Sequence, residues 1–291
     1  MVVCLLLLFV FVSSLTLTYC YKEYALKKSI LDLPNTRSSH VHPTPRGGGV
    51  VFVSIFYLFL LGLWKMEWIS SSFFIALLGG IPVALIGYCD DLYSVRAQWR
   101  ILVHIASAIW GITWLGLVDD VQFVFAILLT IWFINLYNFM DGIDGLAASE
   151  AVFVALISGV VLIQSDFGLS LTCFGLAFSV FGFLYWNWSP AKIFMGDIGS
   201  GFLGYLFSIL MWSTVSTHVL PLFFWLILLA VFLFDATYTL LRRMIQRKKW
   251  YEAHREHIYQ KMVQNGLAHY QMTLIVILVN MIVLLPLALY I

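Results

Sequence analysis

Long runs of hydrophobic residues, separated by short polar breaks, divide this chain into ten segments. Each run is close to the ~20 residues that an α-helix needs to cross the hydrocarbon core of a bilayer. The segments are residues 2–21, 47–64, 71–89, 101–118, 121–138, 147–164, 169–186, 199–216, 219–240 and 271–290. The pattern predicts an all-α integral membrane protein, a bundle of about ten transmembrane helices.

The composition indicates the same class of protein and excludes a soluble one. Of the 291 residues, 62% are hydrophobic and 11% are charged, whereas soluble domains carry about 25% charged residues. No polar stretch is long enough to fold alone, and no repeat of about 20–50 residues is visible. We therefore expect residues 1–291 to form a single polytopic membrane domain. The net charge of +1 gives no reason for a nucleic-acid partner, and we expect none.

The charged residues predict the orientation in the membrane. With ten spans, every second polar break lies on the same side. One such set contains every Lys and Arg except Lys65, and it comprises residues 22–46, 90–100, 139–146, 187–198 and 241–270. Because positively charged loops stay in the cytoplasm, this face is predicted to be cytoplasmic. Both termini are then periplasmic, and an active site is expected on the cytoplasmic loops.

These five loops carry nearly all the candidate chemistry. They contain LDLPNTRSSHVHPTPRGGG, CDDLYSVRAQWR, NLYNFMDGIDG, NWSPAKIFMGDIGSG and RRMIQRKKWYEAHREHIYQKMVQNG. Asp and Asn offer the hard oxygen ligands that Mg²⁺ prefers, while Arg and His bind phosphate oxygens. The combination on one face therefore favours a metal-dependent phosphate reaction.

Each motif also has a simpler explanation when it is taken alone. The acidic pair Asp90 and Asp91 could cap a span, the DG pairs could make tight turns, and RRMIQRKK could bind lipid headgroups. A secondary transporter would also combine many spans with polar residues. However, a transporter places its charges near the bilayer midplane and often shows paired halves, and neither feature is visible here. Five candidates on one face favour an enzyme.

The motifs DD…R, NxxNxxDGIDGLA, PAKIFMGDIGSGFLG and HxxH, in this order, resemble the polyprenyl-phosphate N-acetylhexosamine-1-phosphate transferases, a glycosyltransferase family. The resemblance extends over about residues 32–269. It implies a ten-span bundle with a cytoplasmic active site in the inner membrane of a bacterium. It also implies Mg²⁺ as the cofactor, with Mn²⁺ as an alternative, and it leaves a homodimer open.

The resemblance assigns roles to residues of the NxxNxxDGIDGLA and PAKIFMGDIGSGFLG motifs. Asn138 and Asp197 match the metal ligands of the family. Phe194 matches the aromatic residue that stacks on uracil, and Asp144 matches the residue that hydrogen-bonds the base. Asp141 is expected to order its loop or to hold the waters of the metal.

A second group matches the phosphate-handling residues of the family. Asp90 and Asp91 are expected near the phosphate of the attacking lipid. Arg100 stands where the family usually has lysine and should hold diphosphate oxygens, although the two side chains are not interchangeable. The HxxH loop supplies His254, Arg255 and His257 as a clamp for the diphosphate, and substrate binding is also assigned to Arg46. The assigned catalytic residues are thus Asp90, Asp91, Arg100, His254 and His257.

The family reaction moves a sugar 1-phosphate from a UDP-sugar to undecaprenyl phosphate and releases UMP. LPNTRSSHVHPTPRGGG resembles the branch that initiates O-antigen and capsule synthesis, so the expected donor carries an N-acetylhexosamine or a 6-deoxy-N-acetylhexosamine. UDP-N-acetylfucosamine, UDP-N-acetylquinovosamine and UDP-N-acetylglucosamine remain open. HREH and TPRGGG depart from the muramoyl-pentapeptide branch, which makes a peptidoglycan precursor the less favoured donor. Whether the transfer takes one step or passes through a covalent phospho-enzyme also remains open.

Overall fold

A computed structural model describes residues 2–34, 42–117, 120–248 and 254–290, and almost all of them lie in helices. The helices are α1 (Val2–Lys27), α2 (Gly49–Lys65), α3 (Ser71–Leu78), α4 (Gly80–Tyr93), α5 (Ala97–Trp114), α6 (Asp120–Met140), α7 (Leu146–Leu162), α8 (Phe167–Asn187), α9 (Asp197–Ser216), α10 (Leu222–Leu228), α11 (Ala230–Ile245), α12 (Ile258–Gln264), α13 (His269–Val279) and α14 (Leu285–Tyr290), with a π-helical turn, η1 (Asn280–Leu284), before the last. In the described part of the chain, the one sheet is a two-stranded antiparallel ribbon of β1 (Leu31–Asp32) and β2 (Thr44–Pro45). The prediction of a helical membrane protein is confirmed.

The structure does not confirm ten membrane crossings. Among the described residues, six helical stretches are long and apolar enough to cross a bilayer. The angle between α10 and α11 is 77°, and counting this bent pair as one span raises the number to seven. α2 and α7 are apolar but reach only 17 residues each, and α5 carries Arg100 and His104. Ten spans therefore remain a prediction.

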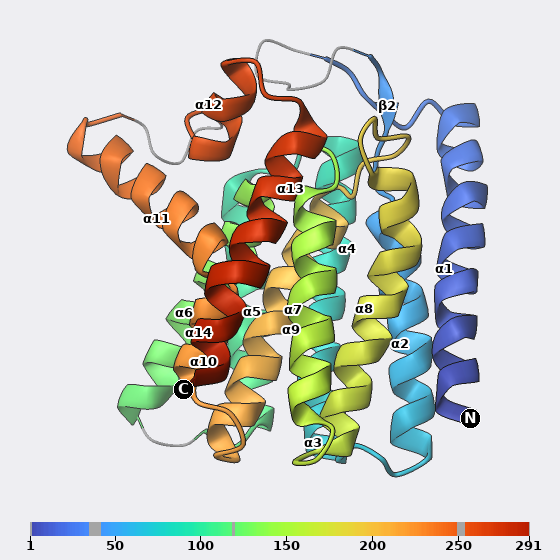
Figure 1. The fold of residues 1–291 in the computed structure, drawn as a ribbon, viewed down its shortest axis with the longest axis vertical. Helices are drawn as coiled ribbons and strands as arrows, with labels where there is room; N and C mark the ends of the chain where they lie inside the picture. The colour runs from blue at the N-terminus through green and yellow to red at the C-terminus, as the bar shows by residue number, and fades with distance from the viewer. Residues whose placement is uncertain (1, 35–41, 118–119, 249–253, 291) are drawn as a thin grey trace.

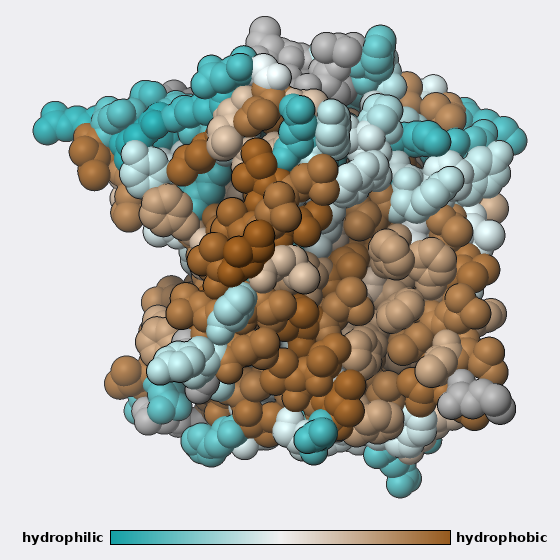
Figure 2. Space-filling model, in the orientation of Figure 1, coloured by the Kyte–Doolittle hydropathy of each residue, from teal (hydrophilic) through white to brown (hydrophobic). Residues whose placement is uncertain are grey.

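The helices form one bundle with an apolar waist and two polar ends (Figures 1 and 2). The β-ribbon and α12 lie at one end, together with the loops that precede α7 and α9 (Figure 1). The start of α1 and the end of α14 lie at the opposite end (Figure 1). The polar loops with the candidate motifs are thus gathered at a single end of the bundle.

Helix α9 is the centre of the bundle. Every residue from Ile198 to Thr214 is buried, and α9 packs against α4 and α6. Glycines allow these close contacts, because a Cβ on Gly204 would lie 2.3 Å from the Phe133 carbonyl oxygen and one on Gly87 would lie 2.4 Å from that of Asp197. Close packing at these two points brings the ends of α4 and α6 next to the first residue of α9.

The bend at Leu229 separates α11 from the bundle. α10 runs within the bundle, whereas α11 projects sideways from it toward the end that carries the β-ribbon and α12 (Figure 1). One side of α11 is apolar and exposed, with Phe234, Leu241 and Ile245 at 64%, 52% and 83% exposure. Its last turn carries Arg242 and Arg243. Such an amphipathic helix suits the boundary between headgroups and acyl chains. The continuous apolar run 219–240 gave no sign of this bend.

Candidate active site

Three helix ends bring two acids and one arginine into contact. Arg100, in the first turn of α5, donates from Nη1 to Asp90 Oδ2 at 2.6 Å and to Asp197 Oδ2 at 3.0 Å. Asp90 also accepts the Val95 N–H on Oδ1 at 2.6 Å, which fixes its carboxylate. The Arg100 and Asp197 side chains are 33% and 31% exposed, so a ligand can reach both. The structure thus joins the CDDLYSVRAQWR and FMGD motifs in one ion-pair network.

Asp91 has a different environment from Asp90. Its carboxylate is buried and accepts the N–H groups of Asp197 at 3.1 Å and Ile198 at 3.3 Å, which are the first two of α9. A carboxylate is favourable there because helix N-termini carry unpaired N–H groups and a positive partial charge. Gly196 adopts φ of 78°, and a Cβ on it would lie 2.3 Å from Asp91 Oδ2. Asp91 therefore caps α9 and positions Asp197, a contact that the sequence did not predict.

The two expected metal ligands lie side by side. The Asn138 side chain, near the end of α6, lies beside the Asp197 carboxylate and donates from Nδ2 to Ser200 Oγ at 3.2 Å. Ser200 donates in turn to the Gly196 carbonyl oxygen at 3.3 Å. The amide and the carboxylate therefore form a polar pair at the start of α9.

The donor set around this pair is suitable for Mg²⁺. Burial, followed by the neighbouring Asp197 and Asp91 carboxylates, raises the pKa of Asp141 well above its ordinary value. Such crowding of acids is favourable when a divalent cation balances the charge. Within the described part of the chain, no three His, Cys, Asp or Glu side chains form a metal cluster. A sparse protein shell suits Mg²⁺, which keeps several waters and takes further oxygens from substrate phosphates.

Asp144 lies in the neighbouring loop and is held by the start of α13. Its Oδ2 accepts the Ala191 N–H at 3.1 Å and lies 3.2 Å from His269 Nδ1. Burial opposes ionisation, but the His269 and Ala191 contacts outweigh it and lower the pKa of Asp144. Asn187 connects the same loop to the FMGD loop, since it accepts the Gly145 N–H at 3.2 Å and donates to the Ile193 carbonyl at 3.0 Å. Neither His269 nor Asn187 was predicted from the sequence.

The β-ribbon positions Phe194. The Phe194 N–H donates to the Pro45 carbonyl at 2.8 Å, and the Phe194 carbonyl accepts the Gly48 N–H at 2.9 Å. Arg46 lies between these two contacts in sequence and is within electrostatic range of Asp91. The backbone of the TPRGGG motif thus positions Phe194, and the same motif places Arg46 near the acids.

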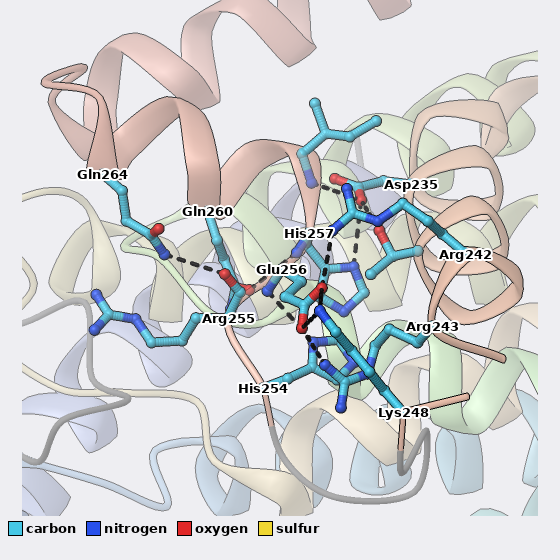
Figure 3. Close-up of polar contacts among 12 residues, drawn as sticks. Asp235, Arg242, Arg243, Lys248, His254, Arg255, Glu256, His257, Gln260 and Gln264 are labelled. Carbon is cyan, nitrogen blue, oxygen red and sulfur yellow. Dashed lines mark hydrogen bonds and ion pairs between the residues drawn. The ribbon is translucent and has the colours of Figure 1, made fainter. Parts of the chain in front are cut away.

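The HxxH loop is organised by Asp235, an acid that was not predicted from the sequence (Figure 3). Asp235, on α11, lies 3.2 Å from His257 Nδ1, and the two side chains are 6% and 4% exposed. It also accepts the N–H groups of Ile258 at 2.9 Å and Tyr259 at 3.0 Å, which begin α12. Asp235 therefore fixes both the His257 ring and the start of α12.

The positive charge of this loop comes from α11 and the residues that follow it. Glu256 accepts from Arg242 at 2.8 Å, from Lys248 at 3.0 Å and from Arg243 (Figure 3). Partial burial opposes ionisation, but the Lys248 and Arg242 hydrogen bonds lower the pKa of Glu256 to about 2. Burial, followed by the charge of Arg243, lowers the pKa of His254 to about 4. His254 is thus neutral near pH 7, and the cations are arginines and a lysine.

A hydrogen bond connects the start of α12 to the end of α6. The Tyr259 hydroxyl donates to the Phe139 carbonyl at 2.9 Å, next to Asn138 in sequence. The Arg255 side chain points away from Glu256 and its cations (Figure 3). The structure therefore brings Asp90, Asp197 and Arg100 into direct contact with Asn138 beside them, and it holds His257 on the adjoining loop.

Comparison with known proteins gives consistent matches. Residues 73–215 match the family model described as glycosyl transferase family 4. The chain is 31% identical over 297 aligned residues to a probable undecaprenyl-phosphate N-acetylglucosaminyl 1-phosphate transferase of Bacillus subtilis, with 92% of this chain and 79% of that protein covered.

Two further relatives show how far the similarity extends. An undecaprenyl-phosphate alpha-N-acetylglucosaminyl 1-phosphate transferase of Thermotoga maritima is 28% identical, with 86% of this chain and 79% of that protein covered. A phospho-N-acetylmuramoyl-pentapeptide-transferase of a Wolbachia from Brugia malayi is 31% identical but aligns with only 55% of this chain and 57% of its own length. The similarity to the first kind of transferase is therefore the more extensive.

Proposed function

Because the chain belongs to the polyprenyl-phosphate N-acetylhexosamine-1-phosphate transferases of glycosyl transferase family 4, we propose that it transfers a sugar 1-phosphate from a UDP-N-acetylhexosamine to undecaprenyl phosphate. The products are undecaprenyl-diphospho-sugar and UMP. The observation that carries the proposal is the Asp90–Arg100–Asp197 network beside Asn138 at one end of the bundle. A water-facing acidic and basic site above apolar walls suits a soluble nucleotide sugar and a lipid acceptor together.

UDP-N-acetylglucosamine is the donor that we propose first. Two relatives that align over most of this chain are named for N-acetylglucosaminyl 1-phosphate transfer. The 6-deoxy donors UDP-N-acetylfucosamine and UDP-N-acetylquinovosamine are the alternatives. The product would begin a cell-surface polysaccharide such as O-antigen, in keeping with the LPNTRSSHVHPTPRGGG motif.

The acceptor has apolar space next to the site. A cavity of about 480 Å³ lies where α6, α11, α12 and α13 meet, and its lining includes Met140, Phe234, Tyr259 and Met272. Asp235, which orients His257, also lines it. A polyprenyl chain lying there would present its phosphate to the HxxH loop and to Arg242 and Arg243.

The proposed chemistry is in-line attack of a lipid phosphate oxygen on the sugar-linked phosphorus, with UMP leaving. Asp197 and Asn138 would hold Mg²⁺, which would neutralise charge on the diphosphate when bound. Arg100 fixes Asp90 and Asp197 and offers further N–H donors to phosphate oxygens. Phe194 and Asp144 provide a ring face and an acceptor for uracil, and His257, fixed by Asp235, belongs to the loop proposed to clamp the diphosphate.

Transfer of radiolabel tests the reaction and the donor together. Purified protein would receive undecaprenyl phosphate, Mg²⁺ and a panel of labelled UDP-sugars that includes UDP-N-acetylmuramoyl-pentapeptide. We expect label in the lipid fraction from an N-acetylhexosamine donor, loss of transfer with EDTA, and its return with Mg²⁺ or Mn²⁺. No lipid product from any donor would reject the enzyme and favour the transporter.

We also propose that the site end of the bundle faces the cytoplasm of a bacterium and that both termini are periplasmic. Lys65 is the last residue of α2 and Lys192 lies in the loop before α9, and both are exposed. The end of α2 and the loop before α9 lie at opposite ends of the bundle (Figure 1). In a cysteine-free background, Lys65→Cys should react with an impermeant thiol reagent on intact spheroplasts. Lys192→Cys should react only after the membrane is opened. The reverse labelling pattern would contradict the proposed orientation.

A further inference from the structure

Two side chains of α13 hold Asp144 in place. His269 Nδ1 lies 3.2 Å from Asp144 Oδ2 and 3.4 Å from the Asp144 main-chain nitrogen. Thr273 Oγ1 donates to the Asp144 carbonyl oxygen at 3.2 Å. Residues four apart lie on the same helix face, so His269 and Thr273 present one surface to the DGIDG loop. The His269 and Asp144 side chains are only 15% and 12% exposed.

The contacts leave a defined acceptor for a ligand. A carboxylate has about four lone-pair positions. The Ala191 N–H and His269 Nδ1 both approach Oδ2, and the Ser189 side chain lies near the carboxylate. Because the Ala191 and His269 contacts are both on Oδ2, Oδ1 can accept one more N–H from a ligand. Uracil offers an N–H at its third ring position, whereas cytosine has an unprotonated acceptor there, so an oriented carboxylate discriminates between the two bases.

We propose that His269 is a positioning residue that orients the Asp144 carboxylate toward the uracil N–H and thereby sets the preference for uracil over cytosine nucleotides. The inference rests on the proposed function, because it takes the ligand of Asp144 to be the base of the nucleotide donor. His269 does not touch the transferred phosphorus. It acts through Asp144, at the edge of the site and away from the acids at the start of α9.

The test compares three substitutions in the first turn of α13. His269→Ala removes the contact with Asp144. His269→Asn keeps an amide nitrogen close to the position of Nδ1, so it should keep most of the wild-type affinity for UMP and most of the preference for UMP over CMP. Gln271→Ala is the matched control, because Gln271 Oε1 accepts the Ala268 N–H at 2.9 Å and supports the same helix start without touching Asp144.

Calorimetry with purified full-length protein would measure UMP and CMP binding, and transfer assays would measure kinetics. For His269→Ala we expect the Kd for UMP to rise about tenfold, the order expected when a hydrogen bond to a charged group is lost. The preference for UMP over CMP should shrink by a similar factor. KM for the UDP-sugar should rise, while kcat, KM for undecaprenyl phosphate and the Mg²⁺ requirement stay at wild-type values. Gln271→Ala should match the wild type in every one of these values.

Three results would overturn the proposal. The first is unchanged UMP affinity and base preference in His269→Ala. The second is an equal loss in Gln271→Ala, which would mean that only the stability of the helix matters. The third is a fall in kcat at unchanged KM for the donor. Failure of the proposed function itself looks different, since wild-type protein would then bind no UMP and transfer nothing from a UDP-sugar.

Discussion

Asp197→Ala and Asn138→Ala should each reduce transfer by about 10²–10³-fold or more, the order expected when a preorganised electrostatic contact at a reacting phosphate is removed. The two side chains lie beside each other, at the end of α6 and the start of α9, so we expect them to act as one metal unit. The double variant should then be hardly worse than Asp197→Ala alone, because residues that serve one ion are not additive. Initial rates of radiolabel transfer across a Mg²⁺ titration would measure this.

Asp166→Ala is a matched control for these variants. Helix α8 begins at the end of the bundle opposite to the site (Figure 1). Asp166 accepts the Leu169 N–H at 2.9 Å and caps α8. Its loss should lower stability by about 1 kcal/mol and leave transfer unchanged. A multiplicative loss in the Asn138 and Asp197 double variant would show independent roles. Normal turnover by Asp197→Ala at the wild-type Mg²⁺ concentration would place the metal elsewhere.

Arg100→Ala should cause the second large loss of activity. It removes the guanidinium that bridges Asp90 and Asp197, so the two carboxylates lose their shared counter-charge and the diphosphate loses a donor. We expect a fall of about 10²–10³-fold in kcat/KM. Arg100→Lys should keep part of the activity, because lysine restores the charge but not the two-pronged geometry. The measurement is kcat and KM for both substrates.

Arg96→Ala is the control for a general loss of positive charge in this loop. Arg96 precedes α5 and has an exposed side chain. Its substitution should leave kcat and both KM values near those of the wild type. Equal rates for Arg100→Ala and wild-type protein would refute the role of the bridge. Equal losses in Arg96→Ala and Arg100→Ala would show that the total charge of the loop matters, and not the contact.

The sequence by itself determined the helices, the gathering of the motifs and the family. Long apolar runs form helices because a bilayer contains no partner for an unpaired backbone N–H or C=O group. The polar breaks alternate between the ends of such a bundle, so DD, DGIDG, FMGD and HxxH had to meet at one end, as the structure shows. The order and spacing of the same motifs are specific enough to indicate the transferase family, which the relatives confirm.

Only the tertiary structure decided which of those polar groups are partners. His269 meets Asp144 across 125 residues, and Arg100 meets Asp197 across 97. Asp91, assigned from the sequence to the same role as Asp90, caps α9 instead of joining the Arg100 bridge. The 77° bend before α11, which brings Asp235 to His257, was also invisible in the sequence. The physical reason is that hydrophobic periodicity records burial alone, whereas these partners depend on which helices pack together and how closely their glycines let the backbones approach.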